Sequence, residues 1–345
     1  MREALRQRLL ERGATDDDIE RAEAQGWLPL LAFDCAVLPG ERRYDLGALA
    51  AAAGIDVDLA QRLWRAVGFP DVPTGAVVFS ERDVAAARLA LVQAGDRDES
   101  TNDLLRQVRV ISGSLARVAS VEADGFTQLL DGLRAAGLSE DAIAESLLSE
   151  EGFEQVAALV DYVHRLQLRA AVWRRTVLAA DPGVAVGVGF ADLAGYTQLS
   201  ARLEPFDLSD LVGRWEAVAY DAIAANGARV VKTIGDEVMF VGLTRESVAA
   251  ALALRDAAEL AALPPLRMGL AAGSVISRDG DYFGPVVNLA SRLTELADPG
   301  ELLVPASLRD ELPEVGAGRV RFVDRGVRDV RSIGPVEVGS LERTG

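Results

Sequence analysis

Residues 228–242 read ARVVKTIGDEVMFVG, two apolar runs on either side of a Gly-Asp pair. Such runs around Gly-Asp are typical of two strands joined by a tight turn. Further strands are predicted by GVAVGVGFAD (183–192), LRMGLAAGSVIS (266–277) and VRFVDRGVRDVRSIGPVEVGSL (320–341). Helical patterns lie between them, at about 206–226, 245–262 and 285–297. The order strand–helix–strand–strand–helix–strand predicts a ferredoxin-like α/β sandwich over residues 180–345.

The chain before this region has a different pattern. Residues 1–179 carry helical periodicity and cap signals, which predicts an all-helical domain and an α+β chain overall. Residues 44–68 predict a helix–turn–helix unit with Gly54 at the turn, and helical segments follow at 100–119 and 121–137. A last helix is predicted at about 152–179, before the break DPG at 181–183.

Composition restricts the class of protein. The chain has 345 residues, is 50% hydrophobic and has a formal net charge of −17. This acidity disfavours bulk binding to nucleic acid or to anionic membranes, but ATP can bind through divalent cations. A single cysteine, Cys35, and a single histidine, His164, exclude an intramolecular disulfide and a metal centre built from these residue types. We see no signal peptide and no apolar run of the ~18–20 residues that a spanning helix needs, and we expect a soluble, cytoplasmic protein.

Two aspartates lie at strand ends. Asp192 comes at the end of the first predicted strand, and Asp236 lies in the turn of TIGDE. Taken singly, Asp192 is more simply a helix N-cap and Asp236 an ordinary turn residue. Together, on adjacent strands, they could hold two Mg²⁺ ions about 3.5–4 Å apart, as in phosphoryl-transfer sites.

A second polar group lies in GDYFGPVVNLASRL, residues 280–293. Asn288 and Arg292 are four residues apart, so they lie on one helical face. An arginine there can neutralise charge on a transferring phosphoryl group, and the asparagine can hydrogen-bond a sugar. The alternative is a solvated helix face, with Asp281 an ordinary loop acid. No P-loop and no G-x-S-x-G motif is found in the sequence.

In combination these residues resemble the catalytic domain of class III nucleotidyl cyclases, from roughly Val184 to Leu312. The resemblance implies that Asp192 and Asp236 bind two Mg²⁺ or Mn²⁺ ions per active site. It implies that Lys232 and Asp281 bind adenine. It assigns the ribose and the transition state to Asn288 and Arg292.

Lys232 is the only lysine among 36 basic residues. Its ammonium can donate to the acceptor N1 of adenine, while Asp281 accepts from the exocyclic amine. Guanine presents the opposite pattern, so this pair would reject it. The planar fork of arginine is a poor substitute for lysine in a closed pocket.

The resemblance implies conversion of ATP to 3′,5′-cyclic AMP and pyrophosphate. In this family the active site spans a dimer interface, with the metal-binding aspartates from one subunit and the other four residues from its partner. Because this chain carries all six residues, we expect a homodimer with two composite sites.

The helical segment is similar to the autoinhibitory domain of certain soluble bacterial class III cyclases. That similarity implies regulation, with a fatty acid or a proton as the kind of ligand, and makes helix 152–179 the coupling element. His164 lies on this helix and is the candidate pH-sensitive residue. The alternative is that His164 is a partly buried helix residue without a regulatory role.

Two other functions stay open from the sequence. One is an ATP-binding sensor whose cyclase domain is not catalytic. The other is a DNA-binding regulator that uses residues 44–68, although residues 1–100 contain 12 Arg against 18 Asp and Glu, and a DNA-reading unit should present a basic face.

Overall fold

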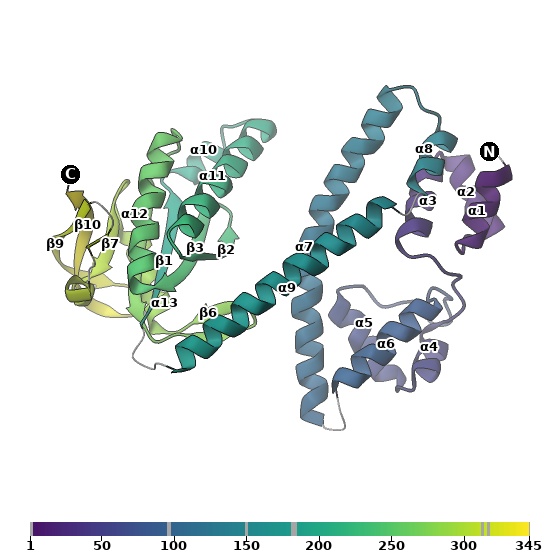
Figure 1. Cartoon of the computed structure of the whole chain (residues 1–345), viewed down its shortest axis with the longest axis horizontal. Coiled ribbons are helices and arrows are strands. Elements are labelled where there is room, and N and C mark those ends of the chain that lie inside the picture. Colours follow the sequence, from purple (N-terminus) through teal and green to yellow (C-terminus); the bar gives the residue numbers. More distant parts are fainter. Residues whose placement is uncertain are drawn as a thin grey trace. The chain divides into compact units, whose positions relative to one another are not determined.

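The computed structural model describes residues 3–94, 98–148, 151–180, 185–311, 314–315 and 318–344. The chain divides into two compact units, Met1–Val172 and Trp173–Gly345. The first is helical and the second contains the sheet (Figure 1). No helix in the described ranges is both long and apolar enough to cross a membrane.

The first unit is built around two groups of short helices. The first group packs around Leu5, Leu9, Ile19 and Ile143 and consists of α1 (Glu3–Glu11), α2 (Asp16–Gln25), α3 (Leu28–Val37) and α8 (Glu140–Leu147). The second packs around Leu49, Phe79 and Val84 and consists of α4 (Leu46–Ala53), α5 (Val57–Val67) and α6 (Glu81–Ala94).

Cap chemistry sets several of these helix ends. Thr15 accepts a hydrogen bond from Asp18 N and Asp18 accepts one from Thr15 N, which is a capping box. Asp45 and Asp56 cap α4 and α5, and Gly54 ends α4 in the left-handed conformation. The predicted helix–turn–helix at 44–68 is therefore confirmed as α4 and α5.

Two long helices complete the helical region. The predicted segments 100–119 and 121–137 are one continuous helix, α7 (Asp98–Ala135), because no proline interrupts the helical hydrogen bonding near residue 120. The predicted helix 152–179 is α9 (Glu151–Ala180). The boundary along the chain between the two compact units falls within this helix.

The second unit has the predicted ferredoxin-like core. Its eight-stranded sheet has the order β2-β3-β1-β4-β7-β10-β9-β8, and its first four strands are those of the strand–helix–strand–strand–helix–strand motif. The strands are β1 (Val186–Leu193), β2 (Arg229–Ile234), β3 (Glu237–Leu243), β4 (Leu266–Gly273), β7 (Leu302–Pro305), β8 (Glu314–Val315), β9 (Gly318–Val330) and β10 (Gly334–Thr344). A separate ribbon pairs β5 (Ile276–Arg278) with β6 (Asp281–Phe283). Short segments α10 (Tyr196–Ser200) and η1 (Ala306–Glu311) complete the unit.

Helices cover both faces of this sheet (Figure 1). Helices α11 (Pro205–Ala225) and α12 (Thr244–Leu260) cover one face around Trp215 and Phe240. Helix α13 (Pro285–Leu296) covers the other face, where Val188, Phe190 and Met239 are buried. Alternate residues of each strand therefore belong to opposite faces.

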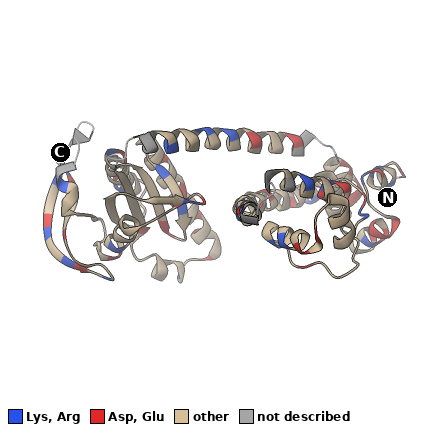
Figure 2. Ribbon diagram, turned by 90° about the horizontal axis from the view of Figure 1, so that it is seen from below, with Lys and Arg blue, Asp and Glu red and all other residues tan. Residues whose placement is uncertain are grey.

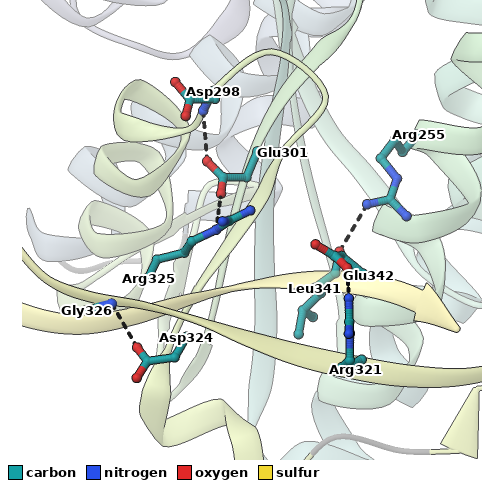
Figure 3. A network of polar contacts seen from close by, with 9 residues as sticks. All are labelled: Arg255, Asp298, Glu301, Arg321, Asp324, Arg325, Gly326, Leu341 and Glu342. Atoms are coloured by element: carbon teal, nitrogen blue, oxygen red, sulfur yellow. Dashed lines mark hydrogen bonds and ion pairs between the residues drawn. The ribbon is translucent and has the colours of Figure 1, made fainter.

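The carboxyl-terminal hairpin β9–β10 is fixed by a polar network (Figure 3). Arg325 Nε donates to Glu301 Oε1 at 2.9 Å, and Arg255 Nη1 of α12 donates to the Leu341 carbonyl at 3.0 Å. These contacts join β9 to the residue before β7, and β10 to α12. They stabilise the part of the sheet that lies beyond the first four strands.

Candidate active site

The strand pairing brings the two predicted metal-binding aspartates together. Asp192 is the penultimate residue of β1, so it lies within the strand rather than after it. Asp236 lies in the two-residue turn between β2 and β3, after Gly235, whose φ of 62° suits this turn. Because β1 pairs with β3 up to Ala191↔Val238, the end of β1 lies beside this turn.

The environment of Asp192 disfavours its negative charge. Burial raises the pKa of Asp192, and the charge of Asp236 raises it further, against a smaller opposing effect of Arg267. Burial also raises the pKa of Asp236. Asp192 Oδ1 is buried and has no hydrogen-bond partner among the described residues.

These observations fit a divalent cation. Two carboxylates whose charge is poorly compensated would be stabilised by positive charge at this position. The described part of the chain has no group of three or more His, Cys, Asp or Glu side chains placed to hold a metal ion. Mg²⁺ is commonly held by one or two carboxylates together with substrate phosphates, so the pair suits a metal that arrives with a nucleotide.

Glu237 is an acidic neighbour that the sequence analysis did not single out. The pKa of Glu237 is raised mainly by burial, and to a smaller extent by the charges of Asp192 and Asp236. The signal available in the sequence was its position directly after Asp236, at the start of β3. Glu237 therefore adds to the negative potential at this edge of the sheet.

Lys232 and Asp281 are in direct contact. Lys232 Nζ lies 2.5 Å from Asp281 Oδ2, joining β2 to β6. The second carboxylate oxygen of Asp281 accepts a hydrogen bond from Tyr282 N at 2.8 Å. The side chains of Lys232 and Asp281 are 38% and 28% exposed, so a ligand could still reach them.

Asn288 and Arg292 lie on α13, as the sequence predicted. Asn288 is exposed, and Arg292 is ion-paired with Glu295 one turn further along the helix. The position of α13 depends on Gly269 of β4, because a Cβ there would lie 2.3 Å from Ala290 O and 2.4 Å from Thr294 N. Thr294 Oγ1 also donates to Ala290 O at 3.1 Å. The close approach of helix and strand fixes where α13 presents Asn288 and Arg292.

The six residues are not part of either of two surface pockets of the second unit. These pockets, of about 300 and 420 Å³, are lined by other residues. The smaller one lies beside the network of Figure 3, and the larger one lies between α11 and the segment after α12.

The candidate regulatory residue His164 lies on α9. Within this chain its side chain is exposed, not partly buried. His164 lies three residues after Asp161, and the Asp161 carboxylate accepts a hydrogen bond from Arg165 Nε at 2.8 Å. Figure 2 shows basic and acidic residues interspersed along α9.

The arginines of the segment 44–68 are engaged with acidic groups. Arg65 is paired with Asp71 at 2.6 Å, and Arg62 lies 3.7 Å from Asp58. These pairings reduce the positive charge that α5 could present to a phosphate backbone.

Comparison with known proteins identifies relatives for both halves of the chain. Residues 1–172 match the family model "Adenylate cyclase regulatory domain". Residues 178–341 match "Adenylate and Guanylate cyclase catalytic domain".

Similarity to individual proteins extends over most of the chain. An adenylate cyclase of Streptomyces coelicolor is 36% identical over 290 residues, which cover 82% of this chain and 75% of the relative. A pH-sensitive adenylate cyclase of Mycobacterium tuberculosis is 33% identical over 94% of this chain and 85% of its own length. The crystal structure of the adenylyl cyclase CyaB from P. aeruginosa aligns with 47% of this chain and 95% of that chain, at 24% identity and a TM-score of 0.41.

Proposed function

This chain belongs to the class III adenylate cyclases that carry an N-terminal regulatory domain, and from that premise we propose how it acts. It converts ATP to 3′,5′-cyclic AMP and pyrophosphate at two composite sites of a homodimer. The helical domain, residues 1–179, regulates the catalytic domain, residues 180–345.

The observation that carries the choice of ATP is the contact between Lys232 and Asp281. One donor and one acceptor lie side by side, which matches N1 and the exocyclic amine of adenine. With guanine both groups would face a partner of the same kind, and unmatched buried polar groups lower affinity strongly. The pair therefore selects adenine when the base enters between them.

The remaining residues orient the phosphates and the ribose. Asn288 hydrogen-bonds the ribose, so that the 3′-hydroxyl faces the α-phosphorus. Arg292 leaves Glu295 and neutralises charge that grows on the phosphoryl oxygens as the bond to pyrophosphate breaks. Asp192 and Asp236 would hold the divalent cations. When bound, such ions lower the pKa of the attacking hydroxyl and neutralise the triphosphate.

The proposed composite site takes Asp192 and Asp236 from one subunit and the other four residues from its partner. A mixing experiment tests it with Asp192→Ala and Arg292→Ala chains, each of which is expected to be inactive alone. With free subunit exchange, half of the dimers are mixed, and each mixed dimer has one intact site. Activity is then expected to return to about a quarter of the parent value. No recovery, with exchange demonstrated by differently tagged chains, would contradict the shared site.

Regulation is proposed to pass through α9. Partial burial lowers the pKa of Arg174 of this helix, and the nearby charge of Arg229 lowers it further, while Tyr282 has the opposite effect. Arg174 therefore lies within electrostatic range of Arg229 on β2 and Tyr282 on β6. A shift of α9 would change the surroundings of the adenine-binding pair.

Deleting residues 1–179 tests this role. Higher specific activity of residues 180–345 would mean inhibition by the helical domain, and lower activity would mean that the domain supports the dimer. A proton is one candidate signal, since one relative is named as pH-sensitive and His164 is exposed on α9. A fatty acid is the other. An unchanged rate with and without the domain, from pH 5.5 to 8 and with added fatty acid, would contradict regulation by this domain.

A further inference from the structure

Strand β2 contains an irregularity that places Lys232 on the sheet face covered by α13. Arg229 pairs with Val241 and Val230 with Phe240, but Lys232 pairs with Met239, so Val231 is an extra residue. Val241 and Met239 are buried on the α13 face, and directly paired residues share a face. The bulge therefore places Arg229 and Lys232 on the same face, although in a regular strand residues three apart lie on opposite faces.

Both basic residues contact β6, at consecutive positions. Lys232 binds Asp281, as described above. Arg229 Nη2 donates to Tyr282 Oη at 3.3 Å, and its guanidinium lies 5.7 Å from the centre of the Tyr282 ring. Two parallel contacts thus join the same two strands.

These two contacts would behave differently when substrate binds. Adenine has to enter between Lys232 and Asp281, so their direct ion pair has to open. Strands β5 and β6 form their own two-stranded ribbon, which among the described residues has no strand pairing with the eight-stranded sheet. Once the ion pair is open, another contact has to keep Asp281 at a fixed distance from Lys232.

We propose that Arg229 and Tyr282, which we call the clamp, are the positioning residues for adenine recognition. The inference rests on the proposed binding of adenine by Lys232 and Asp281. The clamp keeps β6 against β2 while the base is bound, so that Asp281 meets the exocyclic amine and Lys232 meets N1. Neither residue of the clamp touches the reacting atoms.

The chemistry of the clamp suits this role. Arg229 and Tyr282 are half-buried, and Tyr282 packs against the apolar cluster under α13. A guanidinium can stack on an aromatic ring and donate to its hydroxyl, which an ammonium does less well. The backbone N–H of residue 282 donates to Asp281 Oδ1, so the carboxylate is held by the same segment of β6 that the Arg229–Tyr282 contact fixes.

The test compares Tyr282→Phe and Arg229→Gln with the parent full-length protein. Kinetics with ATP and GTP give KM and kcat, and calorimetry gives the Kd of 3′-deoxy-ATP and 3′-deoxy-GTP, which lack the attacking hydroxyl. We expect the KM for ATP and the Kd for 3′-deoxy-ATP to rise about fivefold, the size of one hydrogen bond. The preference for adenine over guanine falls by the same factor, and kcat changes less than about twofold. Arg321→Gln is the control. It breaks the exposed ion pair between Arg321 of β9 and Glu342 of β10 and leaves the clamp intact.

Three results would overturn the proposal. The first is an unchanged adenine preference in both variants. The second is an equal loss for ATP and GTP, which indicates general damage rather than positioning. The third is a parent protein that binds the two deoxynucleotides equally, because then no adenine site exists for the clamp to position. A parent that binds 3′-deoxy-ATP selectively but forms no cyclic AMP would contradict the proposed reaction alone. The clamp would then be judged by calorimetry.

Discussion

Replacing Asp192 by asparagine is expected to stabilise the metal-free protein at neutral pH. Burial and the charge of Asp236 raise the pKa of Asp192. Between the ordinary value of about 3.9 and this raised value, the native state binds more protons than the unfolded state. The free energy of unfolding therefore falls as the pH rises through this window, and the penalty is complete above the raised pKa. Asparagine has nearly the same size and no charge, so it removes the penalty.

The expected gain is about 0.5–2 kcal/mol, the usual range for a single stabilising substitution. For a unit of this size each kcal/mol raises the unfolding temperature by about 2–4 °C. Mn²⁺ at a hundred times its Kd should add about 2.7 kcal/mol to the parent, or roughly 5–10 °C, and much less to the variant. Asp192→Asn should therefore be more stable than the parent in EDTA and less stable than the parent in Mn²⁺.

Calorimetric unfolding at pH 5 and pH 7, each with EDTA or Mn²⁺, measures both effects. In EDTA the difference between variant and parent should be larger at pH 7 than at pH 5. Asp329→Asn is the matched control, because Asp329 is exposed on β9 and should change neither quantity. The reasoning is refuted if Asp192→Asn lowers stability in EDTA at pH 7 and still gains as much from Mn²⁺ as the parent.

Three further predictions concern other parts of the chain. Gly269→Ala should cost about 1–3 kcal/mol in thermal unfolding and most of the activity, because the new Cβ would meet Ala290 O and Thr294 N. Wild-type stability in this variant would mean that α13 is free to move away. Cys35 should resist iodoacetamide at pH 8 until the protein is unfolded, since it is 5% exposed and burial raises its pKa to about 11; mass spectrometry of the native protein would reveal any labelling. Lys232→Met should lower the ratio of kcat/KM for ATP to that for GTP by about a hundredfold, and a ratio unchanged in parallel assays would remove Lys232 from base recognition.

Sequence reasoning predicted the core of the sheet because its strands have clear signals. Apolar runs and the Gly-Asp turn identify β1, β2 and β3, and helical periodicity identifies α11, α12 and α13. Four-residue β7 and three-residue β5 and β6 are too short to show a period. Their strand state depends on partners that lie far away in the sequence.

The candidate site shows the same division. Asp192 lies near the end of β1, Asp236 in the turn after β2, Lys232 and Asp281 on β2 and β6, and Asn288 and Arg292 on α13. The residue types alone suggested their chemistry. The extra residue Val231 could not be predicted, since a bulge is set by how β2 pairs with β3 and not by local composition. Without the bulge, strict alternation would place Lys232 on the opposite face from Arg229. The same limit concealed the clamp, because Tyr282 and Arg229 are 53 residues apart.

Two charged groups of the site, Lys232 and Arg292, are ion-paired within the single chain, and this determines part of what substrate binding costs. Lys232 is paired with Asp281, and Arg292 with Glu295. Partly exposed pairs of this kind are each worth only about 0.2–1 kcal/mol, so ATP can replace them at little cost. Asp192 and Asp236 differ, because nearby positive charge does not offset the burial that raises the pKa of each carboxyl group. The adenine and phosphate contacts therefore exchange one set of pairings for another, whereas a cation at the two aspartates relieves an existing penalty. Cation binding should accordingly supply the larger share of the favourable electrostatic energy when the site fills.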